Sequence, residues 1–198
     1  MLIAIEGVSA AGKTTRAAQY APAVIAEASG TPPTGAVDAG QYWSKRQSER
    51  WLRGLTLEHV HDLACFDTDP LKIHYPWCLW QTGQGTRDAW VTNVAASRTL
   101  LANKQLGFAD RVVLLEPAEQ IVRQQKERDQ SRRRGNFEVN LRLFEPLRRW
   151  YGLLESLAPG RVIFNGHEMP QATPTKTKRD RYSLELFDAL IASADVAP

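Results

Sequence analysis

Short apolar runs alternate with longer segments of helical period along the chain. The runs at 2–6, 63–66, 112–115 and 161–164 are four or five residues long and mostly apolar, which is typical of buried strands. Helices are expected at about 13–28, 41–61, 87–106, from 117 onward, at 137–154 and at 182–192. This alternation predicts an α/β fold with a parallel sheet covered by helices on both faces.

Prolines mark irregularities in this pattern. Pro22 falls near the middle of the first expected helix, whose regularity it disturbs. Pro146 marks a break or restart within 137–154, and Pro117 suits the first turn of a helix. The chain has 198 residues, a length that suits a single domain spanning 1–198.

Composition narrows the cellular setting. No stretch approaches the roughly 18 apolar residues that a membrane span needs, and the chain reaches Glu6 without a basic leader, so we expect neither a membrane span nor a secretory signal. Cys65 and Cys78 lack CxxC spacing and supply neither a disulfide framework nor a zinc cage. We therefore expect a cytoplasmic protein.

The net charge is small but unevenly distributed. Lys and Arg total 25 and Asp and Glu 22, a net +3 that is too small to indicate general nucleic-acid binding. Between 123 and 149, nine basic and four acidic residues give +5. Eighteen of the 25 cations are Arg, whose planar guanidinium binds phosphate oxygens well. We expect no nucleic-acid partner.

One motif carries specific chemistry. The segment 7–14, GVSAAGKT, matches the phosphate-binding P-loop pattern GxxxxGK[ST] and lies between an expected strand and an expected helix. Glycines allow a tight turn that points successive N–H groups at one anion, and the helix adds the positive end of its dipole. Lys13 is expected to reach the β- and γ-phosphates of ATP, and the Thr14 hydroxyl to bind Mg²⁺. The expected nucleotide contacts here are Gly7, Ser9, Ala10, Ala11, Gly12, Lys13, Thr14 and Thr15.

A carboxylate at the end of a neighbouring strand normally assists Mg²⁺ binding beside a P-loop. Asp67 follows the strand expected at 63–66, and Asp69 comes two residues later, on the same side of the chain. Asp67 is the candidate metal ligand, and Asp67 or Asp69 is the candidate base for the acceptor hydroxyl. The alternative is a turn pair before Pro70. Glu116, after the strand at 112–115, is the competing carboxylate.

An arginine-rich segment follows the helix expected from 117. A mobile basic segment opposite a P-loop can close over the γ-phosphate during transfer. The alternative is a solvated basic face. We expect a lid at about 126–137, with catalytic candidates Arg128, Arg132, Arg133 and Arg134.

The acceptor is expected to bind within about 36–62 and 70–98. Arg98 shares a helical stripe with apolar residues, so we expect it to face the interior or a cleft and to meet either an acid or a substrate anion. The aromatic residues Tyr75, Trp77 and Trp80 could stack on a planar acceptor or fill the core. The sequence leaves the oligomeric state open, a homodimer included.

The segment 6–15, EGVSAAGKTT, resembles the opening of the thymidylate kinases and related nucleoside and nucleotide kinases of the P-loop kinase superfamily. The strand at 112–116, Pro117, Arg123 and the arginine cluster are similar to the segments that lead into the lid of these enzymes. The resemblance implies a three-layer fold with a central five-stranded parallel sheet, ATP with Mg²⁺, and phosphoryl transfer to a small-molecule acceptor. It also implies an adenine contact in the loop at Asn165.

The chain departs from this family at several positions. Ala10 stands where Gly is frequent and Ser9 where an acid is frequent, and 67–70, DTDP, replaces an Asp-Arg-aromatic signature. We therefore expect a divergent kinase for another nucleoside, nucleotide or hydroxylated metabolite, antibiotics included. The alternative is a P-loop ATPase or GTPase switch, although no Asn-Lys-x-Asp guanine motif occurs. A third interpretation is a binding protein with a degenerate nucleotide site, against which the intact Lys13 and Thr14 argue.

Overall fold

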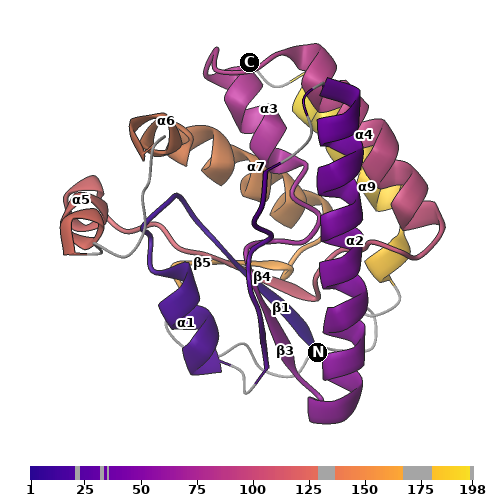
Figure 1. Ribbon diagram of the computed structural model, residues 1–198, viewed down its shortest axis with the longest axis horizontal. Coiled ribbons are helices and arrows are strands. Elements are labelled where there is room, and N and C mark those ends of the chain that lie inside the picture. Colours follow the sequence, from indigo (N-terminus) through magenta and orange to yellow (C-terminus); the bar gives the residue numbers. More distant parts are fainter. Residues whose placement is uncertain (21–22, 32–33, 35, 129–136, 167–179, 197–198) are drawn as a thin grey trace.

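The computed structural model describes residues 1–20, 23–31, 34, 36–128, 137–166 and 180–196, without the side chains of 36–39. Five strands form one parallel sheet in the order β2-β3-β1-β4-β5 (Figure 1). They are β1 (Leu2–Glu6), β2 (Val24–Ile25), β3 (Ala64–Asp67), β4 (Arg111–Leu114) and β5 (Val162–Phe164). The expected α/β class with a five-stranded parallel sheet is confirmed.

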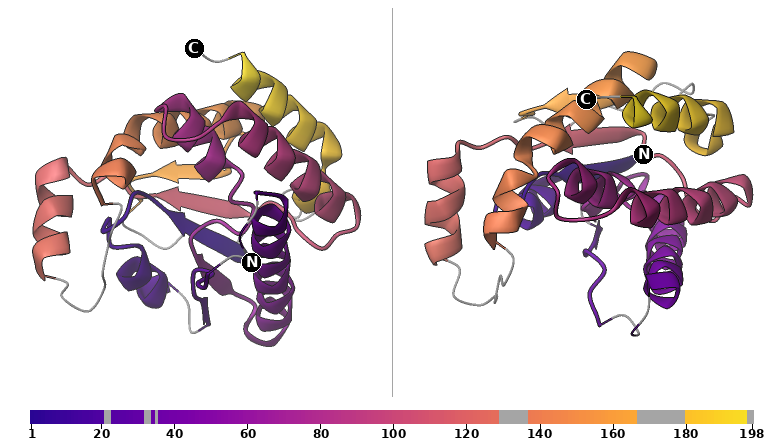
Figure 2. Two further views of the ribbon diagram at one scale, coloured as in Figure 1. Left: turned by 45° about the horizontal axis from the view of Figure 1, so that its top comes forward. Right: turned by 90° about the horizontal axis from the view of Figure 1, so that it is seen from above.

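Helices cover both faces of this sheet. They are α1 (Lys13–Tyr20), α2 (Ala36–His61), α3 (His74–Gln81), α4 (Arg87–Ala102), α5 (Glu119–Arg128), α6 (Phe137–Arg142), α7 (Phe144–Leu157) and α9 (Leu184–Asp195), with a 3₁₀ turn at Asp180–Tyr182. Figures 1 and 2 show α1 on one side of the sheet and α2, α3, α4, α7 and α9 on the other. Parallel strands require such crossover connections, and the helices exclude water from both faces of the sheet.

The register of the central strands brings functional segments together. Ile5 of β1 lies opposite Asp67 of β3, and Glu6 lies opposite Leu114 of β4. The carboxyl ends of three strands therefore meet at one edge of the sheet, where ligands bind in open α/β folds. All five residues of β1 are buried, so the segment that follows this strand starts from a fixed point.

Packing between α2 and β3 anchors the long helix against the sheet. Trp51 is fully buried and stacks on Phe66 at 6.0 Å between ring centroids. Gly54, one turn later, lies against the same ring, and a Cβ there would come within 2.3 Å of Phe66. A glycine is therefore required where the helix approaches the strand most closely.

Several predicted boundaries need correction. The first helix ends at Tyr20 rather than near residue 28, and the strand β2 occupies part of the remaining segment, because Pro22 lacks the N–H that would continue the helix. The aromatic stretch forms α3, with Pro76 in its first turn. The helix expected at 87–106 ends at Ala102. The break expected at Pro146 is present but lies earlier, at Leu143 between α6 and α7, and Pro146 is in the first turn of α7.

The described helices include none with the length and apolarity needed to cross a membrane.

Candidate active site

The turn after β1 has the backbone conformation that its glycines allow. Gly7 has φ +150 and Gly12 φ +89, and a Cβ at Gly7 would lie 2.8 Å from the carbonyl oxygen of Leu115. Ala10 has φ +67, a strained conformation for a residue with a side chain. The first turn of α1 begins at Lys13, so its N–H groups lack partners within the helix. This turn can bind an anion.

Lys13 lies over this turn. Its Nζ donates to the carbonyl oxygens of Gly7 at 2.7 Å and Val8 at 2.9 Å. Burial lowers the pKa of Lys13, while the nearby carboxylates of Glu6 and Glu27 act in the opposite direction. The ammonium is held at the mouth of the turn, where it can meet the phosphates of a bound nucleotide.

Thr14 and Asp67 lie together as the sequence predicts. The Thr14 hydroxyl donates to Oδ2 of Asp67 at 2.6 Å, which joins α1 to the end of β3. Hydroxyl and carboxylate oxygens suit Mg²⁺, which in nucleotide sites keeps several waters and is held by few protein groups plus phosphate oxygens. Among the described residues no cluster of three or more His, Cys, Asp and Glu side chains could hold a metal alone. The Thr14–Asp67 pair therefore fits a metal that arrives with a nucleotide.

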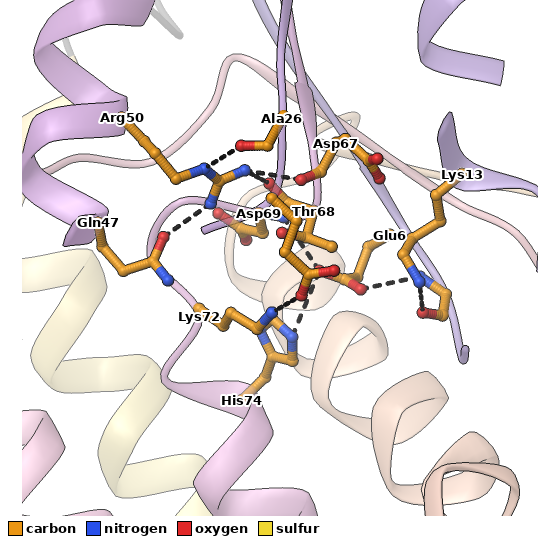
Figure 3. A network of polar contacts seen from close by, with 12 residues as sticks. Glu6, Lys13, Ala26, Gln47, Arg50, Asp67, Thr68, Asp69, Lys72 and His74 are labelled. Atoms are coloured by element: carbon orange, nitrogen blue, oxygen red, sulfur yellow. Dashed lines mark hydrogen bonds and ion pairs between the residues drawn. The ribbon is translucent and has the colours of Figure 1, made fainter. Parts of the chain in front are cut away.

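Glu6 is the centre of a buried polar network behind the P-loop (Figure 3). Its carboxylate accepts from the backbone N–H groups of Gly7 and Asp69, each at 3.0 Å, and lies 3.4 Å from Nε2 of His74. Burial alone would raise the pKa of Glu6, but the attraction and hydrogen bond of His74 and the charge of Lys13 hold it well below its usual range. The network fixes the end of β1 relative to β3 and α3.

The structure corrects the expectation for Asp69. Its Oδ1 accepts from the N–H of Leu71 at 3.0 Å, and its Oδ2 accepts from the Tyr151 hydroxyl at 3.0 Å. The side chain is only 4% exposed, and burial raises the pKa of this carboxyl. Asp69 is committed to bracing the loop after β3 against α7 and is absent from the described lining of the cavity beside the P-loop. The turn-pair alternative describes it better than a base does.

Arg50, on α2, joins the ends of two strands (Figure 3). Its Nε donates to the carbonyl of Ala26, just after β2, and its Nη2 donates to the carbonyls of Asp67 and Thr68, just after β3. Its Nη1 donates to Oε1 of Gln47 at 2.7 Å. One buried guanidinium therefore fixes the positions of both loops that follow these strands.

A cavity of about 500 Å³ opens beside the P-loop, within the 300–1,000 Å³ range typical of small-molecule sites. Its lining comes from the P-loop, the loops after β2 and β3, and helices α2, α3, α4, α6 and α7. The described polar side chains of the lining are Glu6, Ser9, Lys13, Glu27, Trp43, Ser44, Gln47, Thr68, Lys72, His74, Tyr75, Cys78, Asn93, Ser97 and Asn140. These segments overlap the expected acceptor regions.

Glu27 and Lys72 are charged residues of this cavity that were not predicted from the sequence. Glu27 follows β2, Lys72 follows β3, and the Lys72 ammonium forms an ion pair with Oε1 of Glu27. Burial raises the pKa of Glu27, but the larger combined effect of Lys72 and Lys13 lowers it, so this carboxyl is held ionised. Neither residue belongs to a motif. Only recognition of the two-residue strand β2 could have directed attention to Glu27.

The expected acceptor residues are divided by the structure. Tyr75 lines the cavity. Trp77 is fully buried, and its Nε1 donates to the carbonyl of Ala194 at 3.1 Å, while Trp80 stacks on Trp90 at 5.4 Å. Trp77 therefore belongs to the core, and the partly buried Trp80 packs against it, so neither ring lines the described cavity.

Arg98 also requires a correction. Its side chain is 48% exposed, and its Nε and Nη2 each donate to Asp188 of α9 at 2.8 Å. The residue therefore ties α4 to α9 on the surface and does not line the described cavity. The structural ion pair, one of the two alternatives for Arg98, is the one observed.

The segment expected to contact adenine follows β5. Asn165 has φ +53, and its side chain accepts from the N–H of Glu116 at 2.8 Å and donates to the carboxylate of Glu116 at 3.1 Å. Arg16 and Tyr20, both on α1, donate to the carbonyl of Gly166 at 3.0 Å. Glu116 is thus occupied in holding this loop, away from Thr14, whose hydroxyl bonds Asp67 instead.

Most of the expected lid lies outside the described residues, including Arg132, Arg133 and Arg134. Arg128 is the last residue of α5 and is exposed. Arg123, one turn or so earlier, pairs with Glu119 and Glu138 and thereby joins α5 to α6. The catalytic role of Arg128 remains a prediction.

Comparison with solved structures identifies the fold. Three structures of deoxyadenosine kinase from M. mycoides match all or nearly all of the chain. The structure with the products dCMP and a flexible dCDP has a TM-score of 0.54 and 14% identity and covers 100% of each chain. The structure with dATP has a TM-score of 0.53 and 13% identity and covers 98% of this chain and 100% of that chain, and the structure with dCTP has a TM-score of 0.52 and 17% identity and covers 100% of each. The chain has the fold of the P-loop nucleoside kinases. No family model matches it. No curated protein matches its sequence either.

Within this nucleoside-kinase fold the chain is divergent. At 13–17% sequence identity, the similarity to these structures is one of fold and does not assign roles to individual residues. The site is therefore defined by its own geometry: a turn that can bind an anion, a Thr14–Asp67 pair beside it, and a cavity lined by Glu27 and Lys72.

Proposed function

We propose that this protein is an ATP-dependent kinase that transfers the γ-phosphoryl group of ATP to a hydroxyl of a nucleoside. The observation that carries this proposal is the 500 Å³ cavity that shares Lys13 with the P-loop and holds the carboxylate of Glu27. Donor phosphates and an acceptor hydroxyl can thus be brought to one point. The nucleotides bound by the deoxyadenosine kinase structures support a nucleoside-sized acceptor.

The P-loop would hold the triphosphate through its N–H groups and through Lys13. The ammonium of Lys13 is positioned over the turn by its hydrogen bonds to the carbonyl oxygens of Gly7 and Val8. Thr14 and Asp67 would hold Mg²⁺. When bound, this ion neutralises charge that develops on the phosphate oxygens. ATP and Mg²⁺ are the cofactors that we propose for this site.

Glu27 is the proposed base of the reaction. Its ionised carboxylate lines the cavity, whereas Asp67 is bonded to Thr14 and Asp69 lies outside the described lining. The acceptor O–H bond breaks and its proton passes to Glu27 as the acceptor oxygen bonds to the γ-phosphorus. The bond from that phosphorus to the bridging oxygen breaks at the same step, and ADP leaves.

The charges of the cavity favour a neutral acceptor. Two described carboxylates and two described ammonium groups line it, and no arginine occurs in the described lining. Lys13 is assigned to ATP and Lys72 is paired with Glu27. A nucleoside monophosphate would bring up to about two further negative charges into this balanced site. A nucleoside is therefore the better acceptor.

A product screen tests the proposal. Purified protein with ATP and Mg²⁺ is incubated with nucleosides, with their 5′-monophosphates and with hydroxylated antibiotics, and the products are identified by mass spectrometry. We expect a mass increase of one phosphoryl group on at least one nucleoside. Lys13→Met should lower kcat by about a hundredfold or more without changing the melting temperature, because it removes charge at the transferring phosphates.

Lys45→Met is the matched control for this variant. Lys45 is an exposed lysine of α2 and should be replaceable without loss of turnover. Equal activity of Lys13→Met and Lys45→Met would contradict the proposal. Release of inorganic phosphate that ignores every acceptor would instead support the ATPase switch.

A further inference from the structure

Lys72 occupies an unusual backbone conformation beside the cavity. Its φ is +41, in the left-handed region that residues with side chains rarely adopt, and it lies five residues after Asp67. Such conformations cost free energy and persist where surrounding contacts enforce them, often at functional sites. Here the conformation accompanies a side chain that lines the cavity.

The ammonium of Lys72 is held between two cavity residues. It forms an ion pair with Oε1 of Glu27 and lies 5.7 Å from the centroid of the Tyr75 ring. The Lys72 side chain is 22% exposed and the Glu27 side chain 44% exposed, so solvent reaches the pair. Within the described part of the chain, Oε2 of Glu27 has no hydrogen-bond partner. One carboxylate oxygen is therefore clamped and the other is open.

The pair lies between segments that are otherwise unrelated in sequence. Glu27 follows β2 and Lys72 follows β3, and Arg50 ties both loops to α2 through the carbonyls of Ala26, Asp67 and Thr68. Both ends of the ion pair are thus anchored, and its geometry survives exposure to solvent better than a pair on free loops would.

We propose that Lys72 is a positioning residue that clamps one oxygen of the base Glu27 and directs the other toward the acceptor hydroxyl. This inference rests on the proposed kinase function and adds a residue to it. Lys72 does not exchange a proton in the reaction. Its role is to orient the carboxylate and to keep it deprotonated at the pH of catalysis.

The pH dependence of turnover follows from the groups around Glu27. Lys72 and Lys13 lower the pKa of Glu27, whereas burial and the charge of Glu6 raise it. Only the deprotonated carboxylate accepts a proton, so activity falls as the pH drops through this pKa. Loss of the Lys72 charge raises the pKa and moves the acid limb to higher pH. The groups that interact electrostatically with Glu27 are Lys72, Lys13, Glu6, Arg50 and Tyr75.

The test compares the pH profile of kcat/KM for the nucleoside in wild type, Lys72→Met, Lys72→Arg and Lys72→Gln. For Lys72→Met and Lys72→Gln we expect the acid limb to move upward by on the order of one pH unit, with about a tenfold loss on that limb and recovery toward wild type at higher pH. Lys72→Arg should restore the wild-type limb. Ionisation of ATP is common to all variants and cancels in the comparison.

The Glu27→Gln variant tests whether Lys72 acts through Glu27, separately from the proposed kinase function. In that background, Lys72→Met should cause no further shift of the acid limb, because the titrating group is gone. An unchanged limb in both Lys72→Met and Lys72→Gln would overturn the positioning role while leaving the kinase function intact, and so would a loss that is equal at every pH. A wild-type protein that transfers phosphate to no nucleoside would overturn both proposals.

Discussion

The guanidinium of Arg50 serves three parts of the site at once. It is 6% exposed and donates to the loop after β2, to the loop after β3 and to Gln47 of its own helix. Burial lowers the pKa of this arginine, but all three of its nitrogens have acceptors, which offsets the cost of burying the charge. The positions of Glu27 and Lys72 both depend on it.

Arg50→Met should therefore destabilise the fold by roughly 3 kcal/mol, because four acceptors lose their buried donor. Urea unfolding measures this change. Arg46→Met on the same helix is the control, since the Arg46 side chain is 46% exposed and lies 3.6 Å from Glu49, and it should cost less than about 1 kcal/mol. Equal unfolding midpoints for the two variants would show that Arg50 does not brace the site.

Sequence motifs identify residues whose spacing along the chain is fixed by chemistry. The P-loop and the acid after β3 were predicted in this way, and the Thr14–Asp67 hydrogen bond places them together. Glu27 and Lys72 were not predicted, because they meet only through the pairing of β2 with β3. Arg98 was expected to face the interior or a cleft because its helical stripe is apolar. It lies at the surface instead, where it pairs with Asp188 of α9, a contact that local spacing does not reveal.

At the scale of elements, apolar runs located four of the five strands. The strand β2 escaped detection because it has two residues and lies in an alanine-rich stretch that favours helix. Its place in the sheet comes from pairing of Val24 with Cys65 and Ile25 with Phe66, contacts that no local pattern records. The long helix α2 was predicted because its apolar positions recur at helical spacing.

Close packing of α2 on β3 makes a prediction at this scale. Gly54→Ala should destabilise the protein by about 1–3 kcal/mol, because the new methyl group would overlap the Phe66 ring, which Trp51 holds in place. Gly152→Ala in α7 is the matched control, since a Cβ there meets nothing within 4 Å. This variant should gain up to about 1 kcal/mol from helix propensity.

Thermal or urea unfolding of both glycine variants measures these changes in stability. Opposite signs for the two changes support the close approach of α2 to β3. A stabilising Gly54→Ala would mean that the helix lies further from the sheet than the structure shows.

At the scale of the whole molecule, the parallel sheet brings the residues of the site together at one edge. The P-loop follows β1, Asp67 ends β3 with Lys72 five residues later, and Glu27 follows β2, so all of them lie at the same edge of the sheet. The helices α2, α3 and α4 then close a cavity over that edge. The fold class was predictable from the alternation of elements, whereas the cavity was not, because its shape depends on how these helices pack.

The central claim is that the γ-phosphoryl group of ATP passes to a nucleoside hydroxyl and not to water. The most direct measurement follows ATP labelled in its γ-phosphoryl group in a single turnover with wild-type protein, Mg²⁺ and a nucleoside, and quantifies label in each product. We expect most of the label in the nucleoside monophosphate, and Glu27→Gln should slow its appearance by about a hundredfold. Label that accumulates as inorganic phosphate at the same rate with and without nucleoside would contradict the claim.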